Sequence, residues 1–65
     1  MDRKEKIFAY INSNEYVPLK FQEMMIVLDV PESDEEELRN ILHELCMEGK
    51  IVETKKGRYV SIEHE

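Results

Sequence analysis

The sequence has one cysteine, no tryptophan, two glycines and two prolines. Because Cys46 has no second cysteine as a partner, no intramolecular disulfide can stabilise the fold. The longest uninterrupted apolar run, Met24 to Leu28, is far shorter than the roughly 20 residues that a membrane-spanning helix needs. The first residues also lack the apolar run of a secretory signal peptide. These absences predict a soluble, cytoplasmic protein that does not enter a membrane.

The residues that are present suit one small globular domain. Hydrophobic residues make up 42% of the 65 positions, and charged residues make up 37% and are interspersed with them. A chain of this length buries only about 60% of the surface that its unfolded form exposes, so it has room for a single core. We therefore expect residues 1–65 to form one domain.

Charge is distributed unevenly along the chain. The net charge is −6, and the segment 29–48 carries eight acidic residues and one basic residue, Arg39. The segment 50–58 has the opposite balance, with four basic residues and one acid, Glu53. Since affinity for phosphates comes from clustered lysine and arginine, the overall balance argues against an indiscriminate nucleic-acid binder. Any contact with nucleic acid is expected in the basic segment.

Three helices are predicted, at about residues 2–13, 21–28 and 34–48. Asp2 and Glu5 are placed to cap the first of them. In each segment the apolar residues recur on one face at about 100° per residue. The predicted inner faces are Lys4, Ile7, Phe8 and Ile11; Phe21, Met24, Met25 and Leu28; and Leu38, Ile41, Leu42 and Leu45.

The boundaries of the second and third helices have local signals. Pro31 prevents the second helix from continuing, because proline lacks the backbone donor that a helix interior needs. Ser33 is predicted to be the N-cap of the third helix, with Glu36 three residues later completing a capping box. Gly49 is the expected stop, since glycine tolerates the left-handed conformation found after helix ends.

The remaining segments predict short strands. Val17 precedes Pro18 and is therefore biased towards extended geometry, so residues 17–20 are expected to form a short strand that pairs with a later one. Residues 51–54 and 58–62 favour strands and flank a turn that contains a glycine, which predicts a hairpin over about 50–62. The order helix, short strand, helix, helix, hairpin is typical of a winged helix-turn-helix domain. This is an α+β fold with a three-stranded antiparallel sheet.

Three segments resemble the N-terminal winged-helix domain of bacterial ribonuclease R. They are Tyr16-Val17-Pro18-Leu19-Lys20-Phe21, Glu48-Gly49-Lys50-Ile51 and Thr54-Lys55-Lys56-Gly57-Arg58-Tyr59. The resemblance covers about residues 4–60. It implies a domain placed ahead of cold-shock-like modules and a magnesium-dependent nuclease domain that degrades RNA from its 3′ end. The catalytic aspartates and the Mg²⁺ ion of that family belong to the nuclease domain, so the resemblance implies no catalytic residue and no cofactor in this chain.

The resemblance implies that the basic hairpin, or wing, contacts RNA. The predicted nucleic-acid-binding residues are Lys55, Lys56 and Arg58 in the hairpin, Arg39 and Lys20 as secondary contacts, and Asn40 and His43 on the outer face of the third helix. Asparagine and arginine there can read base edges or a 2′-hydroxyl. The alternative for the hairpin is a solubilising turn, and the alternative for the helix face is an ordinary solvated surface.

Two further functions compete with RNA binding. A winged helix used for contact with a protein, or with another domain of the parent enzyme, is indicated by Ile26 and Val27, which lie off the apolar stripe of the second helix, and by Met47. A DNA-binding regulator is disfavoured because the third helix begins with the acidic run 34–37, which would face phosphates in a major groove. No dimerisation element is apparent after Ile62, so the domain is expected to be a monomer.

His43 and Cys46 lie one helical turn apart, but this pair is not expected to hold a metal. His64 is the only other soft ligand in the sequence, whereas a structural zinc site usually needs four ligands. A cysteine nucleophile would need an orienting group and a pocket that a domain of this size does not offer. Cys46 is therefore interpreted as a hydrophobic residue at the border of the core.

Overall fold

The helices and strands follow one another in the predicted order in the computed structural model, which describes residues 2–62. The elements are α1 (Arg3–Ile11), β1 (Leu19–Lys20), α2 (Phe21–Val27), the 3₁₀ helix η1 (Glu32–Asp34), α3 (Glu35–Met47), β2 (Ile51–Glu53) and β3 (Arg58–Ser61). The predicted α+β class is confirmed. The strands are shorter than predicted, and Val17 and Pro18 precede β1 without joining it.

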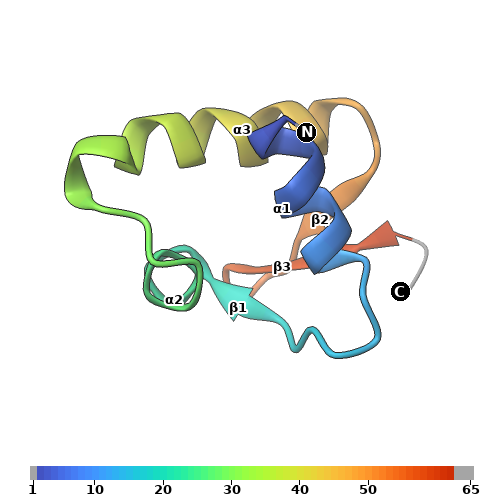
Figure 1. Ribbon diagram of the computed structural model, residues 1–65. Coiled ribbons are helices and arrows are strands. Elements are labelled where there is room, and N and C mark those ends of the chain that lie inside the picture. Colours follow the sequence, from blue (N-terminus) through green and yellow to red (C-terminus); the bar gives the residue numbers. More distant parts are fainter. Residues whose placement is uncertain (1, 63–65) are drawn as a thin grey trace.

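The three strands form one antiparallel sheet in the order β1-β3-β2. The early strand thus pairs with the last one, as predicted, and Leu19 lies opposite Tyr59 while Lys20 lies opposite Arg58. In Figure 1, α3 lies along the side of the molecule opposite the sheet, and α1 runs from the level of α3 down towards β3. Helix α2 lies beneath the N-terminal half of α3 and leads directly out of β1.

The core lies between the helices and one face of the sheet. Its buried side chains are Ile7, Ile11, Met24, Met25, Leu38, Ile41, Leu42, Leu45 and Ile51. Burying one such side chain stabilises the fold by about 1.5–3 kcal/mol. The predicted inner faces of the helices are therefore confirmed for every apolar position, with Phe8, Phe21 and Leu28 packed at the edge of the core. Lys4 is the exception, and its ammonium group reaches the surface of α3 instead.

Three hydrogen bonds fasten the loop after α1 to the sheet. The hydroxyl of Tyr16 donates a hydrogen bond to the carbonyl oxygen of Tyr59 (2.6 Å) and accepts one from the backbone N–H of Leu19 (3.2 Å). The buried hydroxyl of Ser61 donates to the side-chain oxygen of Asn12 (2.8 Å). Because β1 has only two residues, these bonds help to set its register against β3.

The ends of α1 and the start of α3 differ from the predicted boundaries. Asp2 caps α1 by accepting a hydrogen bond from the backbone N–H of Lys4 (3.4 Å), and the helix ends at Ile11 rather than at residue 13. The predicted capping box of α3 is wrong. Ser33 lies inside η1, where the backbone N–H of Asp34 donates to the carbonyl oxygen of Pro31 (2.9 Å), and α3 begins one residue after Asp34. The 3₁₀ turn includes the position at which the predicted N-cap residue would lie.

Helices α2 and α3 end in the same way with different residues. After α3, Gly49 has a φ of 76°, and the backbone N–H groups of Gly49 and Lys50 bond back to Cys46 and Leu45 (3.1 and 3.0 Å). This is a Schellman motif, and the predicted glycine stop is confirmed. After α2, Asp29 takes the same left-handed conformation, with a φ of 54°. Glycine adopts this conformation without steric cost, whereas aspartate, although one of the residues that tolerate it best, adopts it at a cost.

Candidate nucleic-acid interface

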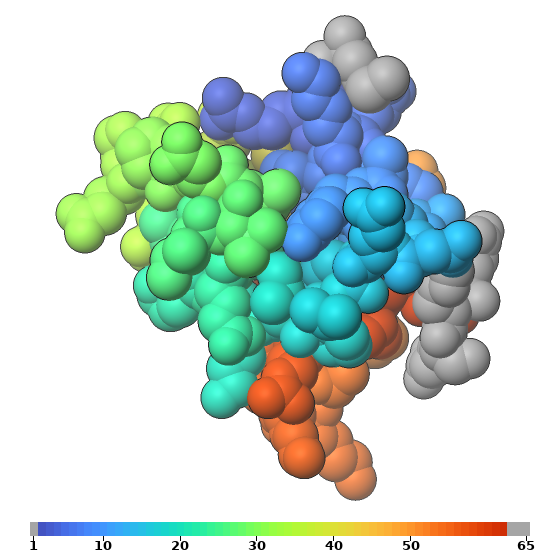
Figure 2. Space-filling model, turned by 60° about the horizontal axis from the view of Figure 1, so that its bottom comes forward, coloured from blue at the N-terminus to red at the C-terminus, as the bar shows by residue number. Residues whose placement is uncertain are grey.

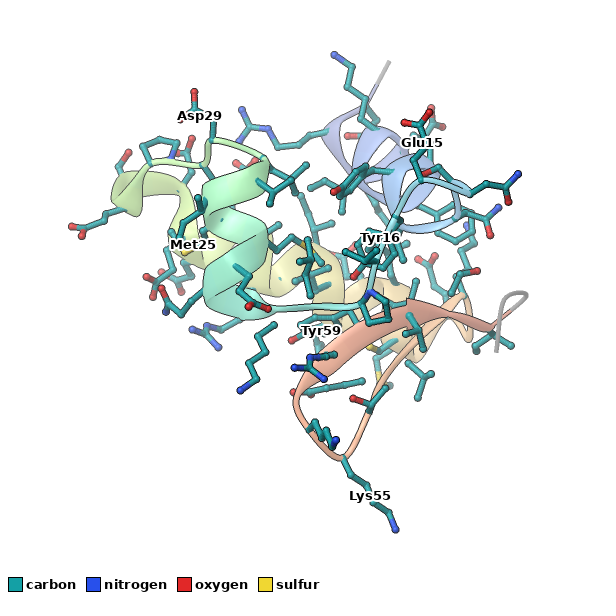
Figure 3. All side chains as sticks on the ribbon, turned by 90° about the horizontal axis from the view of Figure 1, so that it is seen from below. Glu15, Tyr16, Met25, Asp29, Lys55 and Tyr59 are labelled. Atoms are coloured by element: carbon teal, nitrogen blue, oxygen red, sulfur yellow. The ribbon has the colours of Figure 1, made fainter. Side chains whose placement is uncertain are left out.

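The β2–β3 hairpin projects from the body of the domain and carries its basic residues outwards. The turn is closed by hydrogen bonds from the backbone N–H of Thr54 to the carbonyl oxygen of Arg58 (2.7 Å) and from that of Gly57 to the carbonyl oxygen of Thr54 (2.9 Å). Gly57 has a φ of 82°, as the predicted glycine turn requires. Figure 2 shows the hairpin as a protruding lobe, and Figure 3 shows Lys55 pointing away from its tip. Lys56 is also exposed.

Lys20 and Arg58 meet beside the turn of the hairpin, where β3 begins. They are direct partners in the antiparallel pairing of β1 with β3, so their Cβ atoms lie about 4.5–5.5 Å apart on the same face of the sheet. Their neighbours Leu19 and Tyr59 pack against the core. Since side chains alternate along a strand, Lys20 and Arg58 belong to the outer face. Two like charges in this arrangement destabilise the sheet slightly.

Arg39 reaches this region from α3. Its guanidinium lies 4.2 Å from the centroid of the Phe21 ring, and Phe21 directly follows Lys20 in the chain. The guanidinium also lies 3.6 Å from a carboxylate oxygen of Glu35, one helical turn earlier. Burial raises the pKa of the Tyr59 hydroxyl, and the charges of Glu53 and Cys46 add to this rise while that of Arg39 opposes it. The charge of Arg39 therefore acts on Tyr59 of β3 as well as on Phe21 of α2.

Asn40 and His43 lie on the solvent-facing side of α3, as predicted, and both are exposed. They do not belong to the Lys20–Arg58 face, because they come from the side of α3 that is opposite its buried stripe. The structure thus separates the seven predicted contacts into four places. These are the hairpin tip (Lys55 and Lys56), the pair beside the turn where β1 meets β3 (Lys20 and Arg58), Arg39 over Phe21 of α2, and the outer face of α3 (Asn40 and His43).

Two of the three basic residues of α1 are used differently. Arg3 pairs with Asp34 (3.5 Å) and Glu37, and Lys4 pairs with Glu44 (3.1 Å) and Glu48. Hydrogen bonds with Glu48 and then Glu44 raise the pKa of Lys4. The hydrogen bond from Lys4 likewise lowers the pKa of Glu48. These contacts, which we call the α1–α3 ion pairs, fasten the first helix along one flank of the third.

Four cations on or beside the hairpin lack such partners, although Lys50, which precedes β2, pairs with Glu48 (3.5 Å). Within residues 2–62, no carboxylate oxygen lies within 4.0 Å of the side-chain nitrogens of Lys20, Lys55, Lys56 or Arg58. Much of the acidic run that dominates the net charge is thus engaged in the α1–α3 ion pairs and in the Glu35–Arg39 contact. Lys6 on α1 is also exposed and has no ion pair in the described chain, so four of the five lysines and arginines without one lie on or beside the hairpin.

The three residues predicted for protein docking are exposed but do not form one surface. Ile26 is 79% exposed and Val27 is 52% exposed, both in the last turn of α2. Met47 is 74% exposed and ends α3. Figure 1 places that end of α3 away from α2, because α2 lies beneath the other half of the helix. The apolar surface of α2 therefore consists of Ile26 and Val27 without Met47.

Cys46 lies at the edge of the core, as predicted, and burial raises the pKa of its thiol. A raised pKa lowers the thiolate fraction, which does not suit a nucleophile. In the part of the chain that the structure describes, no group of three or more histidine, cysteine, aspartate or glutamate side chains is placed to hold a metal ion. His64 lies outside the described residues. None of the described helices is long and apolar enough to cross a membrane.

Comparison with known proteins gives no family for this chain. No protein-family model matches it, and a search of the curated proteins finds no match.

Proposed function

We propose that this chain is an accessory RNA-binding domain of the winged helix-turn-helix type, which recruits substrate for a ribonuclease R-like 3′–5′ exoribonuclease. The catalytic part of such an enzyme, with its Mg²⁺, lies in another domain, and this domain has no catalytic residue of its own. The observation that carries the RNA-binding proposal is the group of four unpaired cations at the hairpin, namely Lys20, Lys55, Lys56 and Arg58. The link to ribonuclease R comes from the sequence resemblance.

Unpaired cations on a projecting hairpin suit the phosphate backbone. A lysine or arginine that neutralises a phosphate releases a condensed counterion, and this release supplies most of the sequence-independent affinity. A cation that already contacts a carboxylate must first give up that contact. Four cations without such contacts can therefore bind a strand at little electrostatic cost, whereas Arg3 and Lys4 cannot.

The same charges argue against docking of α3 in a DNA major groove. Helix-turn-helix proteins place the N-terminal residues of the recognition helix against base edges. Here that end carries Glu35, Glu36 and Glu37, preceded by Asp34. A carboxylate at contact with a phosphate costs about 1 kcal/mol in bulk water and more where water is excluded. Contact through the hairpin does not require the start of α3 to face a phosphate.

Fluorescence anisotropy with a labelled structured RNA that has a 3′ overhang tests the proposal, with the same sequence in DNA for comparison. The wild-type domain should bind, and its affinity should fall steeply with salt, by a slope of about −0.7 in log K for each phosphate contact to single strands. The triple variant Lys55→Gln, Lys56→Gln, Arg58→Gln should bind far more weakly. Absence of binding to both ligands at low salt would refute the proposal.

A second candidate function follows from the exposed side chains of α2. Ile26 and Val27 form a small apolar surface that is suited to contact with another domain of the parent enzyme or with a separate protein. Binding through these residues would depend little on salt, because it would involve few charges. Substitution of both residues by serine would abolish it and leave RNA binding intact.

A further inference from the structure

We propose that Lys20 and Arg58 form a seat for one phosphodiester group of an unpaired strand, with the guanidinium of Arg39 as a stacking surface for the adjoining base. This inference rests on the proposed RNA-binding function and gives it a location. It places the specific contact where β1 pairs with the start of β3, whereas the prominent lysines of the tip contribute general attraction. We call Lys20 and Arg58 the phosphate seat.

The register of the sheet brings the two cations of the seat together. Lys20 and Arg58 are opposite one another in the β1–β3 pairing, and both side chains extend from the outer face of the sheet. An ammonium and a guanidinium held this close can both contact one phosphate, and the guanidinium can donate two parallel hydrogen bonds to it. A bound anion would also remove the repulsion between the two cations, which no carboxylate within 4.0 Å relieves among the described residues.

The backbone at both residues of the seat is held by a neighbouring side chain. The backbone N–H of Lys20 donates to a carboxylate oxygen of Glu23 (2.8 Å), and the N–H of Arg58 donates to the hydroxyl of Thr54 (3.1 Å). Arg58 is half-buried, whereas Lys20, Lys55 and Lys56 are exposed. Ordered side chains lose less conformational entropy when they bind, and long exposed lysines lose more. Because Arg58 is the least exposed of these four cations, the pair Lys20 and Arg58 should contribute more affinity than the pair Lys55 and Lys56.

The exposed guanidinium of Arg39 indicates that the RNA strand is single-stranded where it binds. One face of its guanidinium lies on the Phe21 ring, and the side chain remains 59% exposed. A base can stack on the other face of a guanidinium plane, as in many single-strand sites. A base inside a duplex is not free to do so. The Glu35 carboxylate contacts one guanidinium nitrogen, Nη2, at 3.6 Å.

The first test compares two double variants that remove the same charge. Lys20→Gln with Arg58→Gln should weaken binding to a short unstructured RNA about 25-fold, at about fivefold for each lost charge contact. Lys55→Gln with Lys56→Gln should weaken it by less than about fivefold. The seat variant should keep or raise the melting temperature, since it removes a like-charge pair. Inorganic phosphate at millimolar concentration should not compete if the seat recognises a polynucleotide.

Equal losses in the two double variants would overturn the seat and leave the proposed function standing. A wild-type domain that binds no RNA would overturn both. Competition by inorganic phosphate as effective as that by RNA would show a site for the free anion and overturn the polynucleotide assignment.

The second test concerns the stacked base. Arg39→Lys keeps the charge and removes the planar face, so it should weaken binding to the normal strand at least about fivefold, given the usual energy of one stacked base. It should leave binding to a strand of equal length without bases unchanged. An equal loss for both strands would overturn the stacking surface, as would tighter binding of a blunt duplex than of the single strand.

Discussion

The α1–α3 ion pairs and the phosphate seat use the same kinds of basic residue in opposite ways. Arg3 and Lys4 each contact two carboxylates between residues 34 and 48, whereas Lys20 and Arg58 face each other without a carboxylate within 4.0 Å in the described chain. The first pair holds two helices together, and the second pair opposes the pairing of two strands. A net charge of −6 is therefore a poor guide to what this surface binds. Which cations are already paired matters more.

The largest expected effect is a difference in RNA affinity between these two regions. Arg3→Gln with Lys4→Gln removes two positive charges, as does Lys20→Gln with Arg58→Gln. The first change should alter affinity by no more than about twofold, because charges beyond a Debye length of about 10 Å from the strand are screened. The second should lower it about 25-fold. Anisotropy titrations at one salt concentration measure both, and equal effects would abolish the contrast between the regions.

The stability of the domain should also depend on the end of α3, which leads into the hairpin. Gly49→Ala should lower the free energy of unfolding by about 1–2 kcal/mol, the cost of a Cβ in the left-handed region. Steric overlap is not the cause, because an added Cβ would meet nothing within 4 Å. Thermal denaturation should show a fall of about 4–8 °C for each kcal/mol. An unchanged melting temperature would mean that the Schellman motif does not hold the start of the hairpin.

The end of α2 has the same geometry as the end of α3, but a substitution there should change the stability in the other direction. Asp29→Gly should raise the free energy of unfolding by about 0.5–1 kcal/mol, because it relieves a strained φ and removes a carboxylate from a helix C-terminus. Asp29→Asn is the matched control, since it keeps the side-chain shape and removes only the charge. Chemical denaturation measures both variants. Destabilisation by glycine would show that the Asp29 side chain makes a contact that outweighs the strain.

The smallest expected effect is the pH dependence of the α1–α3 ion pairs. The pKa of Glu48 is lowered by Lys4, so the stability that this contact adds is present at neutral pH and is lost as the pH falls through the lowered value. The pKa of Lys4 is raised, so its share is lost only as the pH rises through that raised value. Lys4→Met should flatten both limbs of a plot of melting temperature against pH. Lys6→Met, on the same helix, should leave the plot unchanged.

Local patterns were enough to predict the helices and the core. The period of the apolar residues gave the buried stripe of α3, and Gly49 gave its end, because both depend on neighbours within one or two turns. The prediction that Ser33 caps α3 was wrong for the same reason, because it also used only neighbouring residues. The pattern of a serine followed three residues later by Glu36 fits a capping box, but a 3₁₀ turn after Pro31 satisfies the backbone first. No local signal indicates that Asp29 adopts a positive φ.

The site could be predicted only as a set of residue types. Lys20 and Arg58 were both expected near RNA, but their pairing depends on the register of a two-residue strand against β3, and a shift by one residue would move each side chain to the other face. The contacts of Arg3 and Lys4 join residues 31 to 44 positions apart. No periodicity within a helix encodes partners at that distance, so the sequence could not show which cations remain available.

An NMR titration of isotopically labelled protein with a short single-stranded RNA, at low and moderate salt, tests the central claim most directly. We predict salt-sensitive shifts of the backbone amides at Lys20, Arg39 and residues 55–58, with the amides of α1 unmoved. Shifts centred on Arg3 and Lys4, or a spectrum that RNA leaves unchanged at low salt, would contradict the claim that the unpaired cations of the hairpin form the binding surface.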